Sequence, residues 1–112
     1  MESIKKILET VVTNINQDPQ KRKKIKEWIN GYRGKIIGLK TENEAYHLVF
    51  DHDIVTLRTG DYSSCEFCYI GPSEVLMKII QGKESAMRCG MSGAIKGWGS
   101  VNEAQKFEKL LI

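Results

Sequence analysis

The stretch between Gly34 and Ile70 constrains the fold most, because its apolar residues recur with a period of two. It holds four short runs rich in branched and aromatic residues, separated by turn-forming clusters: KIIGLKT, AYHLVF, IVTLRT and SCEFCYI. Alternation places successive side chains on opposite faces of a strand, so Tyr46, Leu48 and Phe50 share one face. The pattern predicts an antiparallel meander with one apolar face.

Two helices are predicted before this stretch, in residues 1–33. The first begins near Ser3, and the second begins at Asp18, a favourable cap, followed by Pro19, which needs no backbone partner for its nitrogen. The residues expected to be buried are Ile4, Ile7, Leu8, Val11 and Ile15 in the first helix and Ile25, Trp28, Ile29 and Tyr32 in the second. Both helices are therefore predicted to be amphipathic.

The last third of the chain, from Ser73 to Ile112, predicts a helix, a strand and a closing helix. Ser73 suits a helix start, and Gly82 suits a left-handed helix end. Met91 to Lys96 suits a short strand, with residues 97–99 turning the chain. The closing helix follows at a capping box, with apolar residues at helical spacing: Val101, Ala104, Phe107 and Leu111.

Together these elements predict an α+β fold with a sheet of about five mainly antiparallel strands, one face of which the helices cover. A chain of 112 residues is long enough for one domain, here 1–112, with the two helices in 1–33 and the sheet and closing helices in 34–112. It has no apolar run of the ~20 residues that span a bilayer. Its N-terminus also lacks a secretory pattern, so we expect a cytoplasmic protein with its three cysteines reduced.

The run VLMKIIQGKESAMRCGMSGAIKGWGSVNEAQKFEKLL resembles the closing segment of the sterol carrier protein-2 family. The matching elements are the helix ending at Gly82-Lys83, the Ala86-Met87 pair, the MSGAIKGWGS segment and the closing helix. The resemblance implies a sterol-carrier-like fold that holds a lipid in an apolar tunnel between sheet and helices. The closing helix, apolar and terminal, is expected to be the lid.

The resemblance further implies which residues line the tunnel: Phe67, Leu76, Ile80, Met87, Met91, Ile95, Phe107 and Leu111. The alternation of the strands adds Leu48 and Phe50. The expected function is non-catalytic binding, with intracellular transfer, of a fatty acid, a fatty acyl derivative or a sterol-like lipid. The alternative is an interaction module or accessory subunit whose own side chains fill the tunnel, because apolar residues at helical spacing are more often core.

The net charge of +3 is concentrated in the second predicted helix, at Lys21, Arg22, Lys23, Lys24 and Lys26. These residues are expected on the side of the helix that faces water. They suit docking to anionic lipid headgroups or a solvated helix face without a dedicated partner. A nucleic-acid patch is the weaker interpretation, since exposed aromatic residues are not expected beside them, and we expect no nucleic-acid partner.

A metal or redox site is not expected. Cys65 and Cys68 form a C-x-x-C pair, but a separation of three within a strand places the two thiols on opposite faces. Cys89, His47 and His52 offer no second closely spaced ligand pair.

Enzymatic chemistry and cofactor binding are not expected either. Ser92 stands in M-S-G-A and not in a G-x-S-x-G elbow, and the carboxylates beside His52 are expected to diverge in a turn. No nucleophile, base and orienting group can therefore be assembled. The segment GWGS lacks the G-x-G-x-x-G spacing of a dinucleotide-binding loop.

Overall fold

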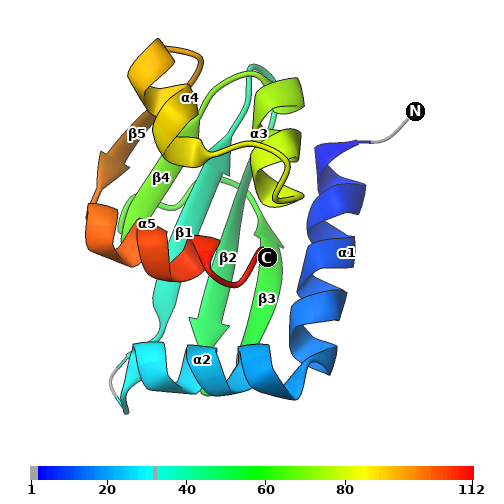
Figure 1. The fold of residues 1–112 in the computed structure, drawn as a ribbon, viewed down its shortest axis with the longest axis vertical. Coiled ribbons are helices and arrows are strands. Elements are labelled where there is room, and N and C mark those ends of the chain that lie inside the picture. The colour runs from blue at the N-terminus through cyan, green and yellow to red at the C-terminus, as the bar shows by residue number, and fades with distance from the viewer. Residues whose placement is uncertain (1–2, 32) are drawn as a thin grey trace.

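Five helices pack against one five-stranded sheet in the computed structural model, which describes residues 3–31 and 33–112 (Figure 1). The elements in chain order are α1 (Ile4–Gln17), α2 (Pro19–Ile29), β1 (Lys35–Lys40), β2 (Ala45–Asp51), β3 (Ile54–Thr59), β4 (Phe67–Ile70), α3 (Ser73–Ile80), α4 (Ala86–Ser92), β5 (Lys96–Gly99) and α5 (Val101–Glu108). The predicted α+β class is confirmed.

The strand order is β3-β2-β1-β4-β5, and every neighbouring pair is antiparallel except β1 and β4, which are parallel. The prediction of a mainly antiparallel sheet is confirmed, but that of a continuous four-stranded meander is wrong. β4 pairs with β1 because the connection 60–66 crosses one face of the sheet. There Tyr62 packs against the ring of His47, with ring centroids 5.3 Å apart.

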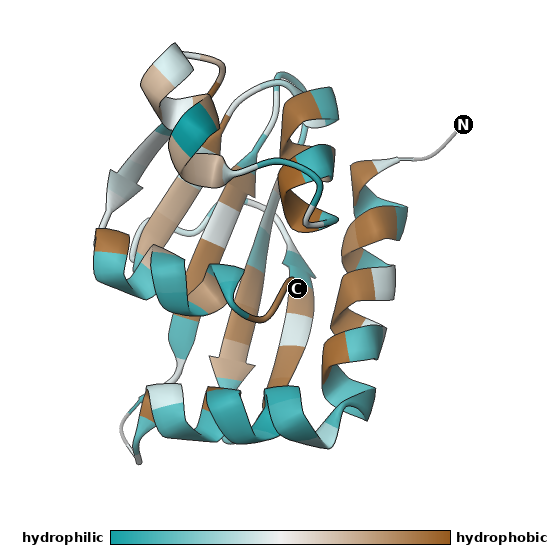
Figure 2. Ribbon diagram, in the orientation of Figure 1, coloured by the Kyte–Doolittle hydropathy of each residue, from teal (hydrophilic) through white to brown (hydrophobic). Residues whose placement is uncertain are grey.

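The hydrophobic core lies between the other face of the sheet and the helices. Alternate strand residues, among them Ile37, Leu39, Leu48 and Phe50, are fully buried on this face. Figure 2 shows apolar residues along the strands and on α1 and α3, whereas α2 is largely hydrophilic. Within residues 3–31 and 33–112, no helix combines the length and the apolar character needed to cross a membrane.

The two N-terminal helices follow the predicted pattern. Ser3 caps α1 by accepting a hydrogen bond from Lys6 N at 3.3 Å, and Asp18 caps α2 by accepting one from Gln20 N at 2.9 Å. The residues predicted to face the core are buried in α1 and α2, except the half-buried Val11. Tyr32 lies outside the described residues.

An additional contact ties α1 to the edge strand β3. The side chain of Asn16 donates from Nδ2 to Val55 O and accepts at Oδ1 from Val55 N, both at 2.9 Å. The amide thereby satisfies two backbone groups that a neighbouring strand would otherwise pair.

The C-terminal part departs from three predictions. The predicted strand over Met91 to Lys96 is wrong, because Met91 lies inside α4, which Gly93 ends with a left-handed φ of 84°. Residues 97–99 were predicted to form a turn and instead belong to β5. Ser73 lies inside α3 after Pro72 and does not cap it, whereas Gly82 ends that segment with φ 75° as predicted.

Candidate ligand-binding groove

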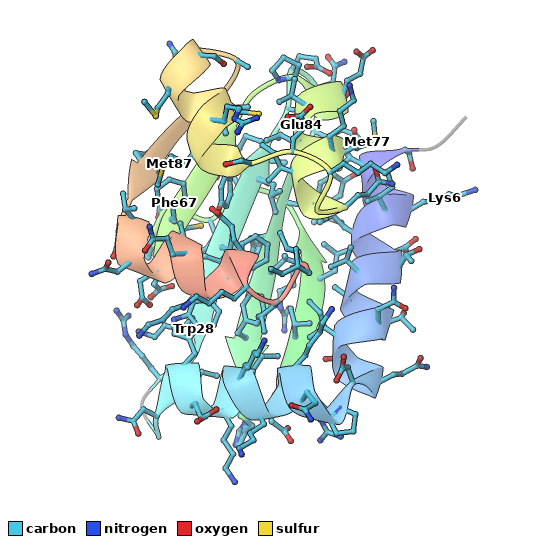
Figure 3. All side chains as sticks on the ribbon, viewed as in Figure 1. Lys6, Trp28, Phe67, Met77, Glu84 and Met87 are labelled. Atoms are coloured by element: carbon cyan, nitrogen blue, oxygen red, sulfur yellow. The ribbon has the colours of Figure 1, made fainter. Side chains whose placement is uncertain are left out.

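An open groove of about 510 Å³ lies between α4 and α5, above β4 and the edge strand β5. We call it the α4–α5 groove. Figure 1 shows the two helices flanking this end of the sheet, and Figure 3 labels Phe67 of β4 and Met87 of α4 in the region between them. Both residues line the groove, with Ile95 and Val101.

Two glycines of β5 shape the floor of the groove. A Cβ atom at Gly97 would lie 2.5 Å from Cζ of Phe67, and one at Gly99 would collide with the backbone of residues 66 and 67. The ring of Phe67 therefore packs directly on the backbone of β5. It also meets the ring of Tyr69 edge to face, with centroids 4.9 Å apart. The floor is consequently aromatic.

Apart from Met87, the wall formed by α4 carries almost no side-chain volume. Ala86, Gly90 and Gly93 follow one another at helical spacing, and all three line the groove. A Cβ atom placed on Gly90 would meet no other atom within 4 Å. The small residues on this side of α4 thus leave the groove open.

The groove also has one polar pair in its wall. Tyr69 donates a hydrogen bond from its hydroxyl to Glu108 Oε2 at 2.6 Å, and both residues line the groove. Burial raises the pKa of Tyr69, and the hydrogen bond and charge of Glu108 raise it further, so the phenol stays protonated. The sequence does not reveal this pair, because no local pattern joins residues 39 positions apart.

Three of the predicted lining residues, Phe67, Met87 and Ile95, do line the groove. Five others are fully buried in the hydrophobic core: Leu48, Phe50, Leu76, Ile80 and Phe107. Aromatic rings fill the centre of the molecule, since Trp28 lies 5.0 Å and Phe107 5.8 Å from Phe50, centroid to centroid. The groove therefore lies to one side of the position expected for the tunnel, around Leu76 and Phe107.

The last two predicted lining residues lie elsewhere. Leu111, together with Ile80, borders a second hollow of about 440 Å³ between α1 and the C-terminal segment. Met91 is 83% exposed on the outer side of α4 and does not line the α4–α5 groove.

The basic residues of α2 are not all exposed to solvent. Lys23, Lys24 and Lys26 are exposed, whereas Lys21 and Arg22 are half-buried. Arg22 Nη2 forms an ion pair with Asp53 Oδ2 at 2.7 Å. None of these residues lines the groove.

The two thiols of the C-x-x-C pair lie on the same face of the sheet, so the prediction of opposite faces is wrong. Cys65 precedes β4 and is outside the strand. Its Sγ and that of Cys68 lie 2.9 and 3.3 Å from the position that a Cβ atom of Gly38 would take. Burial raises the pKa of Cys65 to about 11 and also raises that of Cys68, so both are neutral thiols near neutral pH.

The histidines do not join these cysteines in a site. His47 lies on the same face, where its Nδ1 is 2.9 Å from Gly60 O, whereas Cys89 belongs to α4 on the opposite face. His52 is exposed at the β2–β3 turn, and contrary to expectation its Nδ1 approaches Asp51 Oδ1 at 3.3 Å. No cluster of three or more metal-ligating side chains occurs within the described residues.

Comparisons with known proteins agree with this fold. The family model of the SCP-2 sterol transfer family matches residues 6–112. Among solved structures, the UbiJ-SCP2 ubiquinone synthesis protein superposes with a TM-score of 0.76 at 16% identity, covering 96% of this chain and 91% of that one. Palmitated SCP2L2 from Aedes aegypti gives a TM-score of 0.61 at 17% identity, covering 98% and 95%.

A domain of the same fold also occurs inside a larger enzyme. The sec-alkylsulfatase Pisa1 from Pseudomonas sp. gives a TM-score of 0.68 at 16% identity over 80% of this chain, which spans only 14% of the enzyme's length. At these identities the likenesses show the fold alone. No curated protein sequence matches the chain significantly.

Proposed function

The chain belongs to the SCP-2 sterol transfer family, and from this premise we propose that it binds a hydrophobic ligand without catalysis, in the α4–α5 groove. The proposed ligand classes are a fatty acid, a fatty acyl derivative or a sterol-like lipid, and the proposed role extends to intracellular transfer. The observation that carries the proposal is an apolar groove with an aromatic floor and a wall in which Ala86, Gly90 and Gly93 leave space for a ligand.

The proposed contacts come from the residues that line the groove. Phe67, Met87 and Ile95 would contact the hydrocarbon part of the ligand. Val101 and Ala104 would contact it from the side of α5. Met87 is flexible enough to adapt to ligands of different shape. The buried residues Leu48, Phe50, Leu76, Ile80 and Phe107 would support the groove from the core.

Burial of hydrocarbon accounts for the affinity that such a role needs. A ligand that buries about a dozen methylenes gains on the order of 10 kcal/mol at ~0.8 kcal/mol each, before the cost of association is subtracted. Hydrocarbon burial therefore supplies the main driving force for binding, and this contribution needs no ion pair. A bound ligand would also raise the melting temperature by mass action.

The polar pair favours a ligand with an uncharged polar end. Glu108 presents a carboxylate to the groove, which attracts a hydroxyl donor and repels a second carboxylate. Gln105 lies on the same wall, one helical turn before Glu108. It adds an uncharged hydrogen-bonding group. Beside Glu108, the hydroxyl of a long-chain alcohol or sterol-like lipid therefore fits better than a free carboxylate, whereas Lys96, which also lines the groove, would attract a carboxylate.

A ligand can enter the groove more easily if one of its walls moves. Of the two helices, α4 should be displaced more readily than the closing helix. α5 and the residues that follow it bury Phe107 and Leu110 in the core, so their displacement would expose large apolar side chains. α4 buries only Ala86 and Cys89. We therefore propose α4, in place of the closing helix, as the movable wall.

Gly90 offers a direct test. Gly90→Leu would fill the groove, and it replaces a helical glycine at a position where an added Cβ meets no other atom. The variant should keep or raise the melting temperature but bind a fluorescent long-chain alcohol at least about tenfold more weakly. Gly90→Ala adds one methyl group at the same position and should bind nearly as the parent does.

Mass spectrometry of lipids extracted from the purified protein complements this measurement. Bound lipid in the parent and a loss of lipid in Gly90→Leu are expected. If the parent neither retains lipid nor binds the alcohol, the function proposed here is wrong. The alternative, an interaction module without a ligand, is then favoured. If Gly90→Leu binds as well as the parent, the ligand site lies outside this groove.

A further inference from the structure

We propose that the outer side of α4 docks the opening of the groove onto the surface of a phospholipid bilayer. This inference rests on the proposed function, because a lipid carrier must collect its ligand from a membrane. The surface concerned comprises Met87 and Met91 on α4 and Val101 at the start of α5.

Three exposed apolar side chains flank the opening of the α4–α5 groove. Met87 is 59% exposed, Met91 83% and Val101 58%, although large apolar residues gain most when they leave water. Met87 and Met91 are four residues apart and share one side of α4, while Val101 lies across the groove. Single exposed apolar residues are common, but a group around one opening indicates a binding surface.

A hollow on the outer side of α4 continues this surface. Its lining includes Met87, Arg88 and Met91, with Ser85 and Ser92, and contains a cation but no acidic residue. Met87 also lines the groove itself, so apolar contacts run from the outer side of α4 into the groove. An arginine beside exposed methionines suits a bilayer, where a lipid phosphate accepts its hydrogen bonds above the apolar layer.

Carboxylates near the opening are engaged by other residues. Glu108 accepts the hydrogen bond from Tyr69, and Glu103 pairs with Lys35 Nζ at 2.9 Å and accepts from Trp28 Nε1 at 3.1 Å. Arg88 has no ion-pair partner within the described residues. The local charge therefore does not oppose contact with phosphate headgroups.

The basic residues of α2 offer the competing membrane surface. Figure 1 shows α2 and α4 at opposite ends of the long axis of the molecule, so a bilayer that lies across the α4 end does not reach α2. The exposed residues of α2 include Lys23 and Lys24, and Pro19–Ile29 contains no exposed large apolar residue. α2 would give electrostatic attraction alone, whereas α4 can insert side chains.

Co-sedimentation with vesicles of phosphatidylcholine and phosphatidylglycerol separates the two surfaces. Met91→Gln removes the apolar side chain at unchanged length and charge, and should weaken binding about fivefold or more. Met91→Leu should bind as the parent does. The double variant Lys23→Gln with Lys24→Gln should lose less affinity for the vesicles than Met91→Gln does. The proposal is overturned if the parent does not bind vesicles, if Met91→Gln binds normally, or if the α2 variant loses more.

A second readout keeps this result apart from the proposed function. In solution without vesicles, Met91→Gln should bind the fluorescent alcohol as the parent does, because residue 91 does not line the groove. If the parent binds the alcohol but Met91→Gln binds vesicles as tightly as the parent does, only the docking inference fails. If the parent does not bind the alcohol, the proposed function fails, whatever the vesicles show.

Discussion

The hydroxyl of Tyr69 and the carboxylate of Glu108, 2.6 Å apart, join the floor of the α4–α5 groove to the helix that forms its wall. Tyr69 belongs to β4 and Glu108 ends α5. The hydrogen bond therefore has a structural effect, holding α5 on the sheet. It also places a carboxylate in the lining of the groove.

Glu108→Gln should change ligand preference. In the parent, the carboxylate of Glu108 should repel the carboxylate of palmitate and so lower its affinity relative to that of hexadecanol. The variant removes the charge while keeping an acceptor for Tyr69, so its affinity for palmitate should rise about three- to tenfold relative to hexadecanol. Competition against a fluorescent long-chain alcohol measures the ratio. An unchanged ratio would mean that the polar end of the ligand lies away from Glu108.

The stability of the protein should fall in the alkaline range through Cys65. Its pKa is raised from 9.0 to about 11 by burial first and then by neighbouring charges, so the folded state favours the neutral thiol. The thiol's contribution is complete below the unfolded pKa of 9.0 and is lost as the pH rises towards about 11. Urea midpoints measured across this range should decline more steeply for the parent than for Cys65→Ala. Parallel declines would refute the assignment.

The sequence predicted the elements well where one local pattern decides the structure. The period of two located β1, β2 and β3, and the caps at Ser3 and Asp18 located both N-terminal helices. Each of these signals lies within a few residues, and capping or burial energy acts at that range.

The position of the groove could not be predicted in this way. It depends on β4 crossing to pair with β1, and on two glycines of β5 that let Phe67 pack on bare backbone. It also depends on an aromatic cluster of Phe50 and Phe107 that fills the expected tunnel. These are long-range contacts, whereas the apolar pattern of the sequence only indicates which side chains are buried. The pattern around Phe50 is the same whether its side chain lines a tunnel or fills it.

Two glycines of the groove should respond to alanine with opposite signs. Gly90→Ala should stabilise the protein by about 0.5–1 kcal/mol, because the helix loses a flexible residue and the new methyl group meets nothing. Gly97→Ala should cost about 1–3 kcal/mol, because its Cβ would lie 2.5 Å from the ring of Phe67. Denaturant unfolding of both variants tests the pair. Equal effects would argue against the packing of Phe67 on β5.

Asn16 should contribute to stability through the edge of the sheet. Asn16→Ala leaves the N–H and C=O of the buried Val55 without their partners, at an expected cost of about 1–3 kcal/mol. Asn14→Ala is a matched control, since Asn14 is an exposed residue in the same helix. It should change the free energy of unfolding by less than about 0.5 kcal/mol. Similar losses in both variants would attribute the effect to the helix and not to β3.

Gly38 and Cys65 should prove energetically coupled. A Cβ atom at Gly38 would lie 2.9 Å from the Sγ of Cys65, so Gly38→Ala should destabilise the protein by about 1–3 kcal/mol. Cys65→Ala removes that sulfur, so the double variant should recover part of the loss, with a coupling energy of about 0.5–3 kcal/mol in a double-mutant cycle. Cys68→Ala is the comparison, since its sulfur lies farther away, at 3.3 Å, and should couple more weakly. Additive effects of Gly38→Ala and Cys65→Ala would show that the connection 60–66 does not cross the sheet at Gly38.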